Sequence, residues 1–147
     1  MKRILAILYR FRRLMVVACV LGWVAALVAT HVPGQDLPEF HVSDKTLHVV
    51  GYFGLATLFW FALTAYGVRF GIRLTVVICV LVTYGAVDEI TQAPFHRSPE
   101  VGDWVGDVVG IVLASLAWEV IFRLGRGRQP QSADPQAAKP PYDQYPY

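Results

Sequence analysis

The segment LTVVICVLVTYGAVDEI, residues 74–90, decides the fold of this chain. It begins as an uncharged apolar run, and two adjacent carboxylates, Asp88 and Glu89, follow just before its end. An apolar run of this length is typical of a bilayer-spanning helix, whereas an ionised side chain facing lipid costs a few kcal/mol or more. The segment therefore predicts a transmembrane helix whose two carboxylates face other helices or a water-filled cavity.

Three further apolar runs are similar to this one, and each is close to the length of about 20 residues that crosses a bilayer. The four runs cover residues 14–32, 47–66, 74–90 and 104–122. Of the 147 residues, 55% are hydrophobic and 16% are charged, which excludes an ordinary soluble domain. We predict an all-α polytopic membrane protein with four transmembrane helices in a compact bundle.

The basic residues predict the orientation of these helices. With both termini in the cytoplasm, 11 of the 13 Lys and Arg residues lie inside, and only Lys45 and Arg97 lie outside. We expect a basic interfacial leader at 1–13, a membrane domain at 14–122 and a disordered, Pro- and Gln-rich cytoplasmic tail at 123–147. The net charge of +2 and the absence of a basic patch interleaved with aromatic residues argue against a nucleic-acid partner.

Under this topology the ionisable residues gather at the outer ends of the helices, and helical spacing groups them. Residues four apart share one face of a helix, as in the pairs Asp44 and His48, His48 and Tyr52, Asp88 and Gln92, and Asp103 and Asp107. Asp88 and Glu89 point about 100° apart, so they should meet different neighbours. We expect one of them to meet Arg97 or Lys45, and the other to meet His48 or a water-filled pocket beside Gly85.

Small and uncharged residues in or next to the apolar runs predict how the helices pack. Gly102, Gly106 and Gly110 form a small-xxx-small stripe that permits close contact with a neighbouring helix, and Gly51 and Gly85 should act similarly. The two cysteines, Cys19 and Cys79, lie inside apolar runs, so we expect free packing residues and no disulfide.

Three segments resemble the signature motifs of VanZ-like membrane proteins. DKTLHVVGY at 44–52 resembles their D-K-x-x-H-x-x-x-Y motif, YGAVDEITQ at 84–92 their G-x-x-D-E-x-x-Q motif, and RSPEVGDWVGDVVG at 97–110 their R-x5-D-W-x-x-N-x-x-G motif. The similarity covers about residues 43–115. Asp107 stands where many members have Asn, and APFHR replaces their usual P-G-R turn.

The resemblance implies a four-helix protein of the bacterial cytoplasmic membrane and a set of site residues. The family's named member is associated with resistance to the glycopeptide antibiotic teicoplanin. The residues carried over from the motifs are Asp44, Lys45, His48, Tyr52, Asp88, Glu89, Gln92, Arg97, Asp103 and Asp107.

The leading functional hypothesis is a binding site for an anionic envelope lipid or a cell-wall precursor at the outer leaflet. Lys45 and Arg97 would contact phosphate while carboxylates hold them in position. A competing hypothesis is a hydrolase or transferase in which His48 is the general base, oriented by Asp44 or Glu89. The catalytic candidates are then His48, Asp88 and Glu89.

The same polar residues also fit a structural role and a transport role. They could form a purely structural network that locks the helix ends, or the chain could be a small proton-coupled transporter. A metal site could combine His48, His96 and the carboxylates, but the sequence lacks H-x-x-x-H or H-E-x-x-H spacing, so we predict no metal and no cofactor. Glu119 is expected to form a simple helix-surface pair with Arg123 and to have no role in the site.

Overall fold

The computed structural model describes residues 2–32, 43–95 and 99–126, and every secondary-structure element in this part of the chain is a helix or a 3-10 turn. Four of its helices are long and apolar enough to cross a membrane, which confirms the predicted all-α fold with four spans and makes this a multi-pass membrane protein. In chain order the elements are α1 (Lys2–Arg10), α2 (Arg12–His31), α3 (Asp44–Ala65), α4 (Phe70–Thr91), the 3-10 turn η2 (Ala93–Phe95) and α5 (Val101–Arg126).

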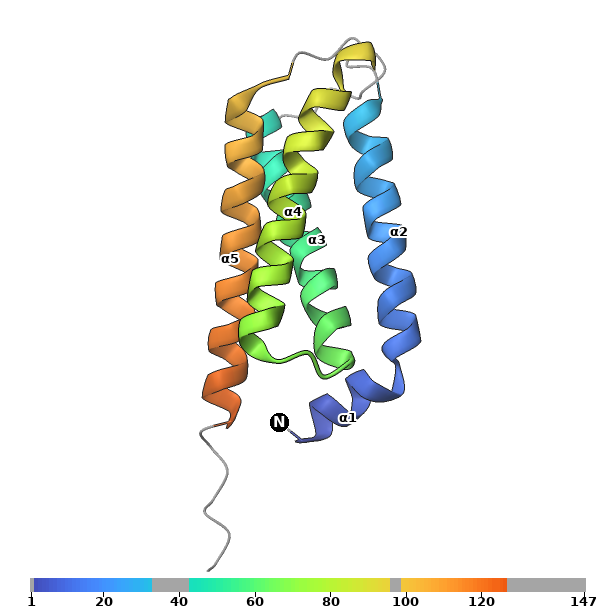
Figure 1. Cartoon of the computed structure of the whole chain (residues 1–147), viewed down its shortest axis with the longest axis vertical. Coiled ribbons are helices and arrows are strands. Elements are labelled where there is room, and N and C mark those ends of the chain that lie inside the picture. Colours follow the sequence, from blue (N-terminus) through green and yellow to red (C-terminus); the bar gives the residue numbers. More distant parts are fainter. Residues whose placement is uncertain (1, 33–42, 96–98, 127–147) are drawn as a thin grey trace, which may run out of the picture.

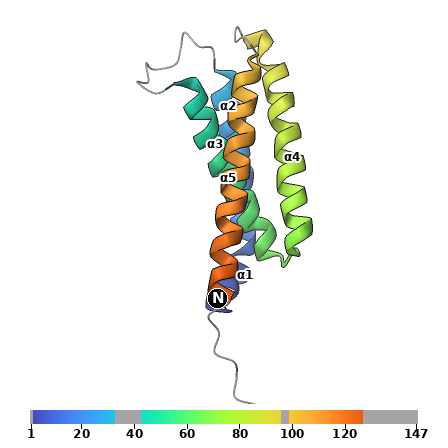
Figure 2. The same cartoon turned by 90° about the vertical axis from the view of Figure 1, so that its left-hand side faces the viewer.

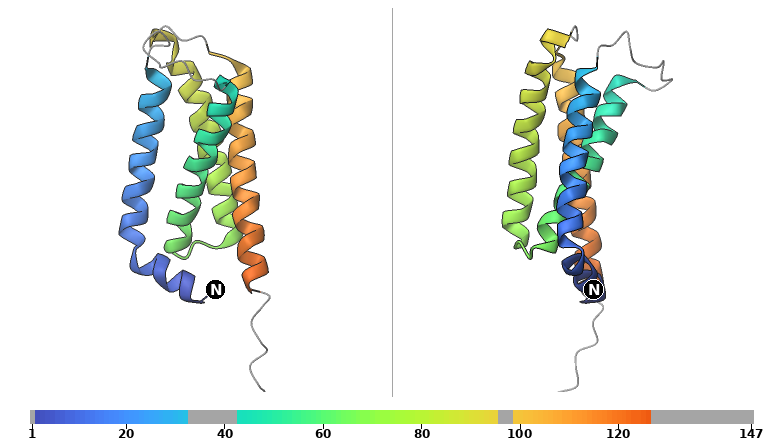
Figure 3. Two further views of the ribbon diagram at one scale, coloured as in Figure 1. Left: turned by 180° about the vertical axis from the view of Figure 1, so that it is seen from behind. Right: turned by 90° about the vertical axis from the view of Figure 1, so that its right-hand side faces the viewer.

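The long helix α3 is the centre of the arrangement. It packs most extensively against α5 and also contacts α2, α4 and α1 (Figure 1). The view from the side shows α3 and α5 running alongside each other, with α4 standing to one side of them (Figure 2). Helix α2 lies on the periphery and leaves large apolar side chains such as Leu21 and Val24 exposed, as expected for a surface that contacts lipid (Figure 3).

The glycine stripe of α5 is the reason why α3 and α5 can approach so closely. A Cβ atom at Gly110 would collide with the backbone oxygen of Val49 and lie 2.9 Å from the backbone nitrogen of Phe53. A Cβ atom at Gly106 would lie 3.2 Å from the backbone oxygen of Lys45. The predicted packing role of the stripe is therefore confirmed. The same prediction for Gly51 was wrong, because no described residue outside its own stretch of α3 places an atom within 4 Å of the Cβ position there.

Local signals set the ends of α3. The Ser43 hydroxyl accepts a hydrogen bond from the Thr46 backbone N–H at 3.3 Å, so the helix begins at Asp44, before the apolar run itself. At its other end, Gly67 adopts a φ of +72° and the Val68 N–H donates to the carbonyl of Leu63 at 3.1 Å. This glycine-terminated cap turns the chain directly into α4.

A group of charged side chains lies at the end of the bundle where α3 ends and α4 begins. Arg73 is only 4% exposed, its guanidinium carbon is 4.3 Å from the ring centroid of Trp60, and it donates to Glu119 at 3.3 Å. Glu119 also accepts from Arg123 at 2.7 Å, as predicted. The expectation of a simple surface pair was nevertheless incomplete, because α4 supplies a buried second cation that the spacing within α5 cannot reveal.

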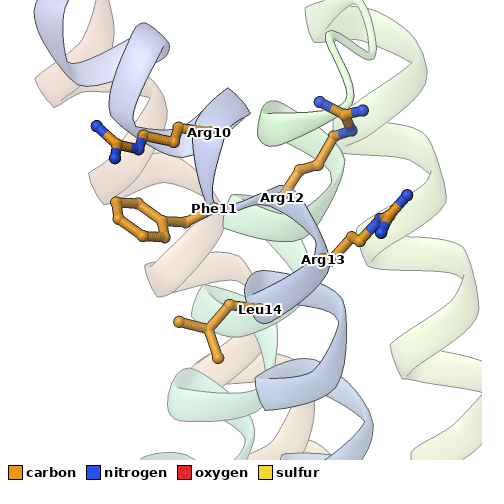
Figure 4. A pocket seen from close by; sticks show the side chains of 5 residues that line it. All are labelled: Arg10, Phe11, Arg12, Arg13 and Leu14. Carbon is orange, nitrogen blue, oxygen red and sulfur yellow. The ribbon is translucent and has the colours of Figure 1, made fainter.

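Helix α1 meets α2 at a corner formed by Phe11. α2 begins at Arg12 rather than at the predicted residue 14, and the α1 side chain of Leu8 is buried in the hydrophobic core. A depression of about 400 Å³ lies at this corner and is lined by residues 10–14 (Figure 4). It is at the opposite end of the bundle from the predicted polar residues, and its arginine side chains point in different directions (Figure 4). We therefore do not assign the functional site to it.

Candidate functional site

The predicted polar residues converge at the end of the bundle where α3 and α5 begin and α4 ends (Figure 1). We call the buried members the polar cluster. They are His48, Tyr52, Asp88, Glu89, Gln92, Asp103 and Asp107. Asp44 and Lys45 are exposed at the start of α3, and Arg97 lies outside the described residues, as does His96. Nine of the ten predicted site residues are thus located, and seven of the nine are buried together.

His48 is the centre of the polar cluster. Its Nδ1 atom donates a hydrogen bond to Oδ1 of Asp107 at 2.8 Å and lies 4.0 Å from Oε1 of Glu89. On the other side of the ring, Nε2 lies 3.9 Å from Oδ2 of Asp103. An imidazole from α3 is therefore surrounded by carboxylates from α4 and α5. We predicted Asp44 or Glu89 as the group that orients His48, whereas the direct hydrogen bond is made with Asp107, which the close α3–α5 contact brings next to the ring.

Asp88 faces α2. Its Oδ1 atom accepts a hydrogen bond from the Thr30 hydroxyl at 2.9 Å and lies 3.7 Å from Nδ1 of His31. No ion pair with Lys45 is formed by either carboxylate in the described segments, and the predicted alternative partner, Arg97, lies outside the described residues, so the expected pairing with Arg97 stays a prediction. The rotation of about 100° between the two residues turns Asp88 toward the periphery of the bundle, where α2 supplies hydroxyl and imidazole groups.

Glu89 connects α4 to the start of α5. Its Oε2 atom accepts a hydrogen bond from the Glu100 backbone N–H at 3.0 Å, and its Oε1 atom accepts one from the Gln92 side-chain amide at 3.3 Å. Glu100 immediately precedes α5, where unpaired backbone N–H groups and the helix dipole favour an anion. Glu89 therefore helps to fix the position of α5, and with it the positions of Asp103 and Asp107 beside His48.

Several buried polar atoms of the cluster have no hydrogen-bond partner among the described residues. They are the Tyr52 hydroxyl, Oδ2 of Asp107 and Oδ1 of Asp103. Tyr52 is 3% exposed and Asp107 is fully buried. Gly85 makes room for both, because a Cβ atom there would lie 2.9 Å from Asp107 Oδ2 and 3.4 Å from Tyr52 Cε1. The predicted packing role of Gly85 is confirmed, because it makes room for side chains from two neighbouring helices.

Two sets of side chains could hold a metal ion, and both contain His48. The first consists of His48, Glu89 and Asp107, all of which are buried, and the second of Asp44, His48 and Asp103. Within each set the potential ligand atoms lie within 4.8 Å of one another. Helical spacing pairs Asp44 with His48 but predicts neither complete set, because each set combines residues from different helices.

Two further side chains lie at this end of the bundle, and neither was among the predicted site residues. Thr30 and His31 belong to α2, and they close the cluster on the side of Asp88. The Nε2 atom of His31 also lies 3.1 Å from the Thr91 hydroxyl at the end of α4. Both residues lie at the outer end of the first apolar run, and this position is the sequence signal that could have identified them as members of the site.

A tryptophan at the start of α5 fixes that helix against α4. Trp104 donates from Nε1 to the Val82 carbonyl at 3.2 Å. The bond holds the first turns of α5 in place, and these turns carry Asp103 and Asp107. Trp104 therefore supports the geometry of the polar cluster without being a member of it.

Comparison of the chain with protein family models, curated proteins and solved structures finds no match. The resemblance to VanZ-like proteins thus remains a prediction based on the motif residues. The geometry of the polar cluster is therefore the basis for assigning a function.

Proposed function

We propose that this chain is a VanZ-like protein of the bacterial cytoplasmic membrane that binds an anionic envelope lipid or cell-wall precursor through the polar end of its helix bundle. The observation that carries this proposal is the burial of one histidine and four carboxylates, from three helices, at a single end of the bundle. Ionisable residues inside membrane segments are costly and mark functional sites by default.

The rim of the cluster supplies the positive charge that an anionic ligand needs. Lys45 is exposed, and its side chain crosses the start of α5, with Cε 2.8 Å and Nζ 3.3 Å from the Cβ position of Gly102. The absence of a side chain at 102 thus lets the lysine lie across the first turn of α5. Arg97 precedes α5 in the sequence and is the second cation that we assign to phosphate recognition.

The orientation of the chain would place this site at the outer leaflet. The bias of basic residues favours cytoplasmic termini, and the polar cluster lies at the end of the bundle opposite α1 (Figure 1). A lipid headgroup or a lipid-linked precursor in the outer leaflet could then reach Lys45, while its tail contacts the apolar surface of the helices.

Lipid retention in native mass spectrometry tests this proposal. The full chain, purified in detergent, is incubated with a polyprenyl phosphate or with a zwitterionic phospholipid. We expect selective retention of the polyprenyl phosphate, and we expect Lys45→Ala to reduce it severalfold. Arg13→Ala removes an exposed cation at the opposite end of the bundle and should leave retention unchanged. Equal retention of both lipids, or equal effects of the two substitutions, would refute the proposal.

A second candidate function is an intramembrane hydrolase or transferase. The observation that favours it is the hydrogen bond of 2.8 Å between His48 Nδ1 and Asp107, since a carboxylate at one ring nitrogen orients the other for general-base catalysis. Phosphate release from an added polyprenyl diphosphate, measured for the wild type and for His48→Ala, tests this function. Release that depends on His48 would support an enzyme, whereas no release by the folded wild type would count against hydrolysis.

A further inference from the structure

We propose that His48, Glu89 and Asp107 bind a divalent transition-metal cation of the Zn²⁺ or Mn²⁺ class. The three residues come from α3, α4 and α5, and all are buried. One imidazole nitrogen and two carboxylates form a donor set that suits such ions, because imidazole favours Zn²⁺ and carboxylate oxygen favours Mn²⁺.

The distances between the ligand atoms fit a shared ion. His48 Nδ1 lies 2.8 Å from Asp107 Oδ1 and 4.0 Å from Glu89 Oε1, and all three ligand atoms lie within 4.8 Å of one another. Ligands at the usual 2.0–2.2 Å from a tetrahedral zinc ion are separated by roughly 3.3–3.6 Å. The present separations are on both sides of that range, so shifts of the side-chain atoms by about one ångström would bring them into place. The ion would replace the Nδ1 proton that now bonds to Asp107, and the neutral imidazole would then carry its proton on Nε2.

A second observation points independently to a ligand at this place. The Tyr52 hydroxyl is buried without a hydrogen-bond partner among the described residues. Oδ2 of Asp107 is likewise buried without a partner among the described residues, and both this atom and the Tyr52 ring edge lie beside Gly85, at 2.9 Å and 3.4 Å from the Cβ position there. Unsatisfied buried polar atoms are uncommon in native proteins and require an explanation. With an ion bound, Asp107 uses its oxygens as ligands and Tyr52 donates to a ligating carboxylate, which fixes the orientation of that carboxylate.

The charge of the cluster also favours a cation. Glu89, Asp103 and Asp107 surround a single imidazole, and no lysine or arginine within residues 2–32, 43–95 and 99–126 lies within 4 Å of these carboxylates. A divalent ion would offset the negative charge at the centre of the cluster. It would also give the site a direct contact for phosphate. The contact with phosphate rests on the proposed function, whereas metal binding itself does not.

Metal titration of the full-length protein tests the proposal without any lipid ligand. The detergent-purified chain is stripped with a chelator, dialysed and titrated with Zn²⁺ or Mn²⁺ while heat release and bound metal are measured. We expect one equivalent of metal per chain and a rise in Tm on binding. Glu89→Gln and Asp107→Asn should each weaken binding at least about tenfold. The matched control is Glu119→Gln, which neutralises a carboxylate at the opposite end of the bundle and should bind like the wild type.

The wild type decides the outcome even if a substituted chain does not fold. Absence of stoichiometric binding and of any Tm shift in the stripped wild type would overturn the inference. So would a loss of affinity in Glu119→Gln as large as that in Glu89→Gln. Retention of anionic lipid by a wild type that binds no metal would refute the metal site alone and leave the proposed function intact. Metal uptake without selective lipid retention would support the metal site and count against the proposed function.

Discussion

Replacing Gly110 with alanine should force α3 and α5 apart. The added methyl group would collide with the Val49 backbone oxygen and lie 2.9 Å from the Phe53 backbone nitrogen. A flexible side chain could rotate away from such a contact, but backbone atoms in the middle of a helix cannot. The two helices must therefore separate, and this separation also moves His48 relative to Asp107.

The expected loss of stability follows from this contact. Overpacking a well-packed interior typically costs about 1–3 kcal/mol. Alanine in place of glycine within a helix contributes roughly 0.8–1.0 kcal/mol in the opposite direction. Gly54→Ala is the matched control because it makes the same change in α3, where the rest of the described structure leaves open space around the new methyl group. Gly110→Ala should thus be about 1–3 kcal/mol less stable than Gly54→Ala.

The assay is thermal unfolding of the two variants and the wild type in the same detergent. Gly54→Ala should melt at or slightly above the wild type, and Gly110→Ala several degrees below it. Titration with Zn²⁺ provides a second measurement, since a displaced His48 should bind metal more weakly in Gly110→Ala than in Gly54→Ala. A melting temperature of Gly110→Ala equal to or above that of Gly54→Ala would refute the close approach of α3 and α5.

Topology and the contact between α2 and α4 give two further predictions. Reporter fusions at Gln35 and Pro99 should read as external and fusions at Gly71 and Gln131 as cytoplasmic, because 11 of the 13 basic residues then lie inside. Opposite sidedness at any one of these points would contradict the topology. Thr30→Val keeps the shape of the side chain but removes a hydrogen bond of 2.9 Å to a buried carboxylate, so it should lower the stability in detergent by about 1.5–3 kcal/mol. An unchanged melting temperature would contradict that contact.

The membership of the polar cluster could largely be predicted from the sequence, but its pairing could not. Helical spacing placed His48 and Tyr52 on one face of α3, and Asp103 and Asp107 on one face of α5. All four are buried in the cluster. The hydrogen bond between His48 and Asp107 joins residues 59 positions apart, and the bond between Thr30 and Asp88 joins residues 58 positions apart. Periodicity within one helix carries no information about which neighbouring helix a given face meets.

The sequence by itself determined that this chain is helical and has four membrane-spanning segments. The physical reason is local, since apolar runs of about 20 residues fit the thickness of a bilayer in which every backbone polar group needs an internal partner. The tertiary structure alone decided which charges lie together. The rotation of each helix about its axis turned Asp88 toward α2 and Glu89 toward the start of α5, and it placed Arg73 against Glu119. These rotations follow from close packing at residues such as Gly85 and Gly110, where the absence of a side chain lets elements distant in the sequence touch.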